Sequence, residues 1–143
     1  ATTMQMAMVA AAVGNSGVTM RPGLVDQAAA PDLAPLETFE PTEFAQAMSR
    51  ENAAQLADMM VGVVNEGTGS NAQIPGVEVA GKTGTAETAR DRPNIAWFIS
   101  FAPATNPQVA VAVAIERSGA AEVGGNTLAA PIARAVMQAV LSG

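Results

Sequence analysis

In three stretches of the second half of the chain, larger apolar side chains recur at alternate positions, the period of two that is typical of β-strands. These stretches cover about residues 77–88, 95–102 and 108–116. The residues expected on one face of the middle stretch are Ile95, Trp97, Ile99 and Phe101. Asn106-Pro107 supplies turn residues before the last stretch. Because such short connections join antiparallel neighbours, we expect a three-stranded antiparallel sheet over residues 77–117.

The third stretch predicts a sheet with one face of large side chains and one of small ones. Its larger residues are Val109, Val111, Val113 and Ile115, and alanines alternate with them. An alanine face lets a helix lie close, so we expect the C-terminal helix, residues 127–142, to cover it. Pro131 fits only in the first turn of this helix, where its missing N–H costs nothing.

Two further helices are predicted in the first half of the chain. Residues 4–13 are apolar on nearly all sides, which is typical of a buried helix, and Thr2 with Gln5 has the spacing of a capping box. Residues 14–17 tolerate positive φ and end this helix. Ser49 is the predicted N-cap of the second helix. The buried stripe of that helix is expected to comprise Leu56, Met59, Met60, Val63 and Val64.

The segment between these helices is rich in proline and acidic residues. Residues 26–41 contain Pro31, Pro35 and Pro41, so we expect a loop with little regular structure there. A short helical turn is predicted over residues 43–48. The predicted fold class is therefore α+β, a three-stranded antiparallel sheet flanked by helices. Its expected parts are a helical region 1–67 that contains the loop 26–41, the sheet 77–117 and the helix 127–142.

Composition and charge exclude several classes of function. The net charge of -6 argues against nucleic acid as a partner, and no basic cluster indicates an anionic membrane surface. No apolar run is long enough to span a bilayer. The chain contains neither cysteine nor histidine, which excludes a Cys/His metal site and a histidine general base. We expect no metal and no cofactor.

Lys82 is the only lysine of the chain and lies in the first predicted strand. Thr83 and Thr85 face the same way by alternation, and a glycine at position 84 indicates close approach by another backbone or a ligand. Two hydroxyls, a nearby ammonium and an exposed strand edge could together hold a carboxylate. A lysine on a strand is also a common edge charge that discourages aggregation. The pattern alone leaves both interpretations open.

Several motifs, in a fixed order, resemble the transpeptidase domain of the penicillin-binding proteins, in its class B or monofunctional branch. The Lys-Thr-Gly strand and the Ala-Trp-Phe-Ile-Ser-Phe-Ala-Pro strand that follows it resemble the third and fourth sheet strands of that domain. The stretches that carry the resemblance are residues 3–10, 14–17, 60–68, 80–87 and 96–103. The chain begins at Ala1 with a predicted helix almost at once. We therefore expect it to be the C-terminal part of one transpeptidase domain in a longer protein.

The resemblance implies acyl transfer. In the family a serine attacks a D-Ala-D-Ala amide or a β-lactam ring, assisted by a lysine three residues later and by the serine of a Ser-x-Asn element. Lys82 matches the family lysine that adds positive potential near the substrate carboxylate. Thr83 and Thr85 match the hydroxyls that hold this carboxylate, and the Thr85 N–H matches one oxyanion donor. Gly84 would let the substrate backbone come close.

The nucleophile implied by the resemblance is absent from the chain. No serine is followed by lysine three residues later or by asparagine two residues later. If the family mechanism applies, the N-terminal remainder of the domain must supply these groups. The implied ligands are peptidoglycan stem peptides and β-lactams, and the implied location is the extracytoplasmic face of the bacterial cell membrane. Without its remainder, the apolar helix at residues 4–13 would lose partners, so we expect the isolated chain to form dimers.

Two functions of the parent protein remain open from the sequence. One is a serine-type peptidoglycan D,D-transpeptidase. The other is a β-lactam sensor or a catalytically inactive penicillin-binding scaffold, which would use the same strand for binding. A Ser-x-x-Lys element in the parent argues against a scaffold, and turnover of a peptide donor argues against a sensor. A serine β-lactamase shares the strand motif, but the Trp97-Phe98 strand and the long preceding helices disfavour it.

Overall fold

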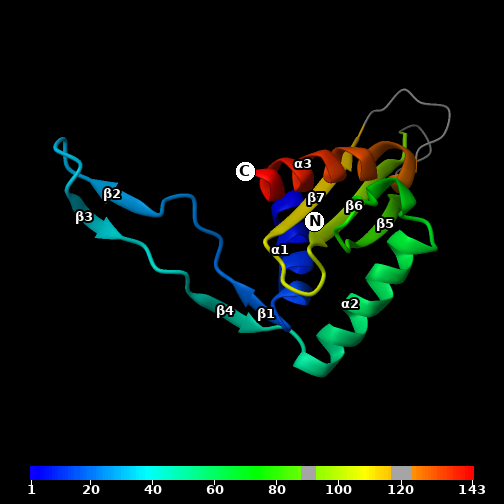
Figure 1. Ribbon diagram of the computed structural model, residues 1–143, viewed down its shortest axis with the longest axis horizontal. Coiled ribbons are helices and arrows are strands. Elements are labelled where there is room, and N and C mark those ends of the chain that lie inside the picture. Colours follow the sequence, from blue (N-terminus) through cyan, green and yellow to red (C-terminus); the bar gives the residue numbers. More distant parts are fainter. Residues whose placement is uncertain (88–92, 117–123) are drawn as a thin grey trace.

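A three-stranded antiparallel sheet organises the body of the molecule in the computed structural model, which describes residues 1–87, 93–116 and 124–143 (Figure 1). Its strands are β5 (Ala80–Ala86), β6 (Ile95–Ala102) and β7 (Val109–Ile115), with β6 in the centre. The register of β5 on β6 runs from Ala80 opposite Phe101 to Ala86 opposite Ile95. The predicted fold class is thus confirmed.

The first strand begins later than the sequence predicts. Residues Ile74 and Val77 form an isolated antiparallel bridge around Gly76, which has a φ of 78°, and the ladder with β6 starts only at Ala80. Val77 closes this turn, so the three residues 77–79 that alternation assigns to the strand come before the ladder with β6. The predicted end of this strand at Thr88 and the sheet boundary at 117 lie outside the described residues.

Two helices cover opposite faces of the sheet. Helix α3 (Ala130–Ser142) packs Ala133 and Met137 against Phe98 and Val111, on the valine face of β7. Helix α1 (Thr3–Gly14) packs Val13 against Phe101 and Ala110, on the alanine face. The prediction that the C-terminal helix covers the alanine face is therefore wrong. The buried side chains of α3 are mostly alanine, so this helix fits the larger valines of that face.

The ends of these helices follow the sequence signals. Thr2 and Gln5 form the predicted capping box at the start of α1. A π-helical turn, η2 (Gly125–Ala129), precedes α3, so the helical segment starts two residues before the predicted position, and Pro131 lies in the first turn of α3. Helix α1 is less buried than predicted, because Met4 is 50% exposed. In the described ranges, no helix is both long and apolar enough to cross a membrane.

Helix α2 (Arg50–Asn65) lies beside β5 and is capped by Ser49, whose hydroxyl accepts a hydrogen bond from the Asn52 N–H. Its buried residues are Ala53, Met60 and Val64. Met60 joins the cluster that contains Ala80. Met59, which the predicted stripe includes, is 62% exposed. The buried stripe is narrower than predicted, because α2 contacts the sheet along the edge strand rather than across a full face.

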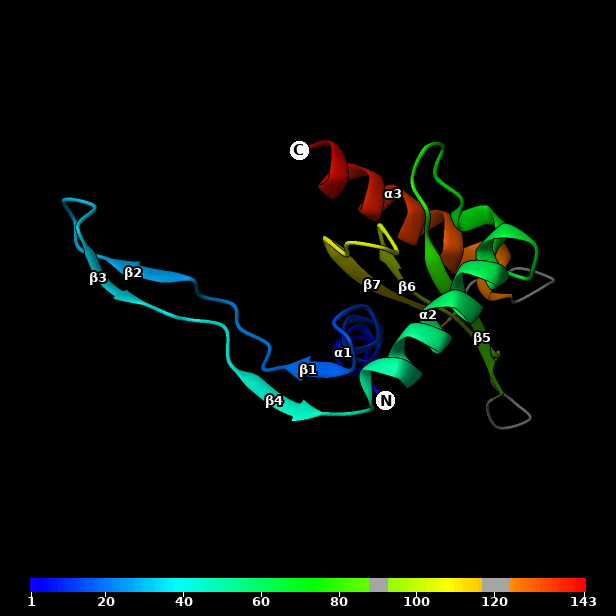
Figure 2. The same ribbon diagram turned by 60° about the horizontal axis from the view of Figure 1, so that its bottom comes forward.

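Residues 18–46 form an arm that projects from the body (Figures 1 and 2). Its strands are β1 (Val18–Met20), β2 (Gln27–Ala29), β3 (Pro35–Thr38) and β4 (Glu43–Gln46), paired as β1 with β4 and β2 with β3. The predictions of a helical turn at 43–48, of a loop with little regular structure at 26–41 and of a helical region over 1–67 are therefore wrong. A four-residue segment is too short to be stable as a helix, whereas pairing with β1 satisfies its backbone groups. Pro35 is tolerated because it is the first residue of its strand.

The base of the arm is fixed to the body by the turn that follows α1. Ser16 and Gly17 have φ values of 56° and 86°, as the sequence predicts for this turn. The carbonyl of Gly17 accepts a hydrogen bond of 2.8 Å from the Ala47 N–H. A Cβ added at Gly17 would lie 2.2 Å from the carbonyl oxygen of Met48, so only glycine fits between the two ends of the arm.

Candidate functional site

The predicted site residues lie on β5, which is an edge strand of the sheet. Among the described strands β5 pairs only with β6, which leaves its other edge free. Thr83 is opposite Phe98 and Thr85 is opposite Ala96, which puts both threonines on the sheet face that α3 covers. Lys82, opposite Ile99, belongs to the other face and is exposed. The two threonines thus face the same way, as the sequence predicts, and the Lys82 side chain starts from the opposite face.

A hollow of about 280 Å³ lies at this end of β5. Three predicted residues share it, Thr83, Gly84 and Thr85, whereas Lys82 does not line it. The rest of its wall comes from elsewhere in the chain and comprises Thr68, Gly124, Gly125 and Asn126. Sequence reasoning missed these four residues. The available signal was glycine on both sides of Thr68 and the pair at 124–125, since glycine marks close approach of backbones.

Thr83 has a polar partner at both its side chain and its backbone. Its Oγ1 lies 2.8 Å from Oγ1 of Thr68, within hydrogen-bond distance. Its carbonyl accepts a hydrogen bond of 2.7 Å from Nζ of Lys82. The ammonium thus reaches from the opposite face of the strand to the backbone between the two threonines. The Lys82 ammonium and the Thr68 hydroxyl therefore both contact Thr83.

The wall of the hollow formed by Gly124, Gly125 and Asn126 lies directly on the sheet, and Thr68 forms the other wall. A Cβ added at Gly125 would lie 2.2 Å from the carbonyl oxygen of Trp97 and 3.0 Å from the Gly84 nitrogen. A side chain at position 125 would therefore push η2 away from the β5–β6 pair. This contact explains the glycine at position 125 and sets the depth of the hollow beside Gly84.

Asn71 and Asn126 hold the two walls together. Asn71 lies in the short 3₁₀ helix η1 (Ser70–Ala72), which starts two residues after Thr68, and Asn126 lies in η2. The Asn71 N–H donates to Oδ1 of Asn126 at 3.0 Å, and Nδ2 of Asn71 donates to the Asn126 carbonyl at 3.1 Å. Nδ2 of Asn126 donates to Oγ of Ser70 at 3.4 Å. These bonds fix the width of the hollow.

The residues around this hollow suit a small anion. Hydroxyls of Thr68, Thr83 and Thr85 can donate hydrogen bonds, the Lys82 ammonium lies close by, and a strand edge offers backbone N–H groups. A carboxylate accepts such bonds with both oxygens. The described residues contain no group of three or more acidic side chains positioned to hold a metal ion.

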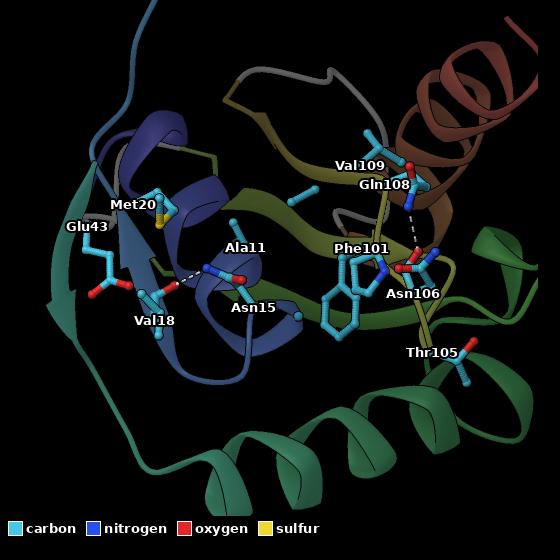
Figure 3. Close-up of a pocket in the computed structure, with 13 residues that line it drawn as sticks. Ala11, Asn15, Val18, Met20, Glu43, Phe101, Thr105, Asn106, Gln108 and Val109 are labelled. Carbon is cyan, nitrogen blue, oxygen red and sulfur yellow. Dashed lines mark hydrogen bonds between the residues drawn. The ribbon is translucent and has the colours of Figure 1, made fainter. Parts of the chain in front are cut away.

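A wider hollow of about 740 Å³ lies at the other end of the sheet, between α1, the base of the arm and the β6–β7 turn (Figure 3). Phe101 lines it, five residues along β6 from the partner of Thr85, which corresponds to about 17 Å. Two of its polar side chains already form hydrogen bonds within their own loops. Nδ2 of Asn15 donates to the Val18 carbonyl and Nε2 of Gln108 donates to the Asn106 carbonyl. We therefore assign the candidate site to β5.

Comparisons with known proteins identify the family of the chain. The family model of the penicillin binding protein transpeptidase domain matches residues 1–138. The chain is 45% identical to peptidoglycan D,D-transpeptidase PbpA of Mycolicibacterium smegmatis, over 98% of this chain and 29% of that protein. It is 36% identical to stage V sporulation protein D of Bacillus subtilis, over 94% of this chain and 22% of that protein.

Solved structures show the same relationship. Penicillin-binding protein A of M. tuberculosis, in an imipenem acyl-enzyme complex, is 45% identical with a TM-score of 0.87, and the match covers 99% of this chain and 31% of that one. The D,D-transpeptidase domain of a peptidoglycan glycosyltransferase from Eggerthella lenta is 41% identical with a TM-score of 0.83, over 99% of this chain and 33% of that one. The chain spans about a third or less of the length of these relatives. On its sequence and its fold, the chain belongs to the penicillin-binding protein transpeptidase family.

Proposed function

We propose that this chain supplies the substrate-binding strand of a peptidoglycan D,D-transpeptidase whose nucleophilic serine lies outside these 143 residues. The observation that carries the proposal is the hollow beside β5, where Thr83 and Thr85 present hydroxyls along a free strand edge. Relatives named as D,D-transpeptidases, and a relative solved as an imipenem acyl-enzyme, support the choice of reaction. The reaction is acyl transfer from a stem peptide, with β-lactams as acylating inhibitors.

Each site residue has a distinct role in this proposal. The hydroxyls of Thr83 and Thr85 donate hydrogen bonds to the substrate carboxylate. The Thr85 N–H contributes one of two donors to the oxyanion that forms during acylation, and loss of one such donor costs about 3 to 4 kcal/mol of transition-state stabilisation. Lys82 raises the positive potential around the carboxylate. Gly84 has no side chain, so the substrate backbone can lie against the strand.

The partners and the location of the parent protein follow from this role. The N-terminal remainder of the same domain supplies the serine and its two helpers, because this chain contains neither Ser-x-x-Lys nor Ser-x-Asn. Peptidoglycan stem peptides are the substrates, which puts the site on the extracytoplasmic face of the cell membrane. Separated from that remainder, the chain associates with itself, because large apolar side chains stay exposed on α1 and on the arm.

Labelling with a fluorescent penicillin tests the role of Lys82 in the full-length parent protein. Lys82→Ala should slow acylation by about a hundredfold, since hydrogen bonds and charge contacts to an ionised group contribute about 1.5 to 3 kcal/mol. Lys82→Arg should retain part of the rate. Arg50→Ala is the matched control, because it removes one exposed positive charge at the start of α2. A Lys82→Ala protein that is acylated at the wild-type rate would refute the assigned role.

The alternative function is a β-lactam sensor or a catalytically inactive scaffold. A β-lactam sensor would be acylated but would transfer no peptide, and an inactive scaffold would bind without acylation. The same strand serves all three, so β5 does not discriminate among them. Incubation of the parent protein with a stem-peptide donor and an acceptor amine, followed by mass analysis of the product, separates them. We favour the transpeptidase because PbpA, at 45% identity, and the domain from Eggerthella lenta, at 41% identity, carry that name.

A further inference from the structure

Thr68 lies outside the β5 strand, yet its hydroxyl reaches the site. It follows α2 in the chain, and its Oγ1 is 2.8 Å from Oγ1 of Thr83, so one of the two hydroxyls donates to the other. Both residues line the hollow beside β5. The distance alone allows either direction of donation. The ligand that the hollow receives decides between the two directions.

The backbone around Thr68 is held in a fixed position. The Gly69 N–H donates a hydrogen bond of 2.8 Å to the Val63 carbonyl. A Cβ at Gly69 would lie 3.2 Å from Cγ1 of Val63 and 3.3 Å from Cε2 of Phe98, so the loop lies directly on the core. On its other side, η1 is bound to η2 through Asn71 and Asn126. Thr68 is therefore presented to Thr83 by a rigid segment, as a positioning group must be.

The geometry points to Thr68 as a positioning residue that sets the direction of the hydrogen bond made by Thr83. This inference rests on the proposed function, in which the Thr83 hydroxyl contacts a substrate carboxylate. An ionised carboxylate only accepts hydrogen bonds, so Thr83 must donate its proton to it. The lone pairs of Thr83 then accept the proton of Thr68. The chain of donation runs from Thr68 to Thr83 to the carboxylate.

This arrangement affects ligand binding in two ways. The bond from Thr68 holds the Thr83 side chain in one of its three staggered rotamers. It also polarises the Thr83 hydroxyl, and successive hydrogen bonds in a chain strengthen one another by about 10–30%. Donation in the reverse direction would aim the lone pairs of Thr83 at an anion. Thr68 thus acts through Thr83 and needs no contact with the substrate.

Acylation kinetics of the full-length parent protein test this inference. The second-order rate constant for a fluorescent penicillin is measured for Thr68→Val, Thr68→Ser, Thr83→Val and the Thr68→Val/Thr83→Val double variant. We expect Thr68→Val to lower the rate constant about fivefold, in keeping with the loss of one ordinary hydrogen bond. Thr68→Ser keeps the hydroxyl and should stay close to wild type. In the Thr83→Val background, Thr68→Val should cost nothing further, because the two residues act as one unit.

Controls separate positioning from folding. Thr127→Val changes an exposed threonine of η2 that does not line the hollow and should leave the rate constant unchanged. Melting temperatures show whether each variant folds, and Thr68→Ala replaces Thr68→Val if valine does not fit the loop. An unchanged rate in Thr68→Val, an equal loss in the Thr83→Val background, or a Thr68→Ser protein as slow as Thr68→Val would overturn the inference. If Thr83→Val itself has no effect, or the parent is not acylated, the proposed function fails instead.

Discussion

At the scale of single residues, Gly81 is the position where β5, α2 and the core approach most closely. A Cβ there would lie 2.5 Å from Cζ of Phe98, which is fully buried, and 3.1 Å from Cγ2 of Val64. Gly81→Ala should therefore lower the free energy of unfolding by about 1–3 kcal/mol, the usual cost of overpacking. The midpoint of urea unfolding measures this change.

Gly62 provides the matched control for Gly81. It lies inside α2, and a Cβ there would meet no atom within 4 Å. Gly62→Ala should raise the free energy of unfolding by about 0.5–1 kcal/mol, because alanine loses less backbone entropy in a helix. If both variants lose stability to the same degree, the close contact with Phe98 does not explain the glycine at position 81.

Half of the candidate site could be predicted from the sequence at this scale. The Lys-Thr-Gly tripeptide identified the strand, and alternation correctly put Thr83 and Thr85 on one face. Thr68 and Asn126 could not be found in this way. Their proximity to β5 depends on how a loop and a π-helical turn fold back over the sheet, and no local period encodes that contact.

At the scale of elements, helix packing depends on a few fully buried side chains. Met137 of α3 is completely buried against the sheet, whereas Met59 of α2 is 62% exposed. Met137→Ala should lower the free energy of unfolding by about 2–5 kcal/mol through lost burial and a residual cavity. Met59→Ala should change it by less than about 0.5 kcal/mol, as is usual for surface positions.

The sequence predicts that both methionines are apolar helix residues, but it does not predict this difference. Urea unfolding of the two variants, compared with the wild-type chain, measures it. If Met59→Ala and Met137→Ala lower the free energy of unfolding equally, Met59 is buried in solution, for example by self-association of the chain. A small loss at Met137 would contradict the packing of α3 on the valine face.

The elements that carry strong periodicity were predicted well, and the arm was not. Three strands and three helices follow alternation, capping boxes and helical stripes that can be read locally. The arm consists of strands of three or four residues that exist only because distant segments pair, such as Val18 with Gln46. Prolines at 31, 35 and 41 hid these pairings, since proline more often marks a loop.

At the scale of the whole molecule, the distribution of exposed apolar side chains predicts self-association of the isolated chain. The arm carries Leu24, which is 96% exposed, and Leu33, which is 83% exposed, together with Leu36. Helix α1 exposes Met4 and Val9 to a smaller degree. Apolar surface of this kind favours contact with a second copy. Light scattering after gel filtration should therefore show dimers or larger species at micromolar concentration.

Two sets of substitutions test which surface drives this association. Leu24→Ser, Leu33→Ser and Leu36→Ser together should shift the chain toward monomer more strongly than Met4→Gln with Val9→Gln, because the arm residues are more exposed. None of these positions contributes to the buried clusters of the body, so the fold should survive. A wild-type chain that is monomeric at high concentration would contradict the prediction.

The isolated chain should bind benzylpenicillin weakly and without a covalent bond. It contains the hollow beside β5 but no Ser-x-x-Lys, so it lacks the nucleophile that the proposed mechanism requires. Lys82 and Thr85 are exposed, and a carboxylate contact at such a surface contributes about 1 kcal/mol or less. Calorimetry should therefore detect little heat, and the intact mass after incubation should equal that of the untreated chain.

The full-length parent protein, treated in parallel, is the positive control and should gain the mass of one penicilloyl group. A stoichiometric adduct on the isolated chain would mean that one of its own serines is the nucleophile. The proposal that the nucleophilic serine lies outside these 143 residues would then be wrong.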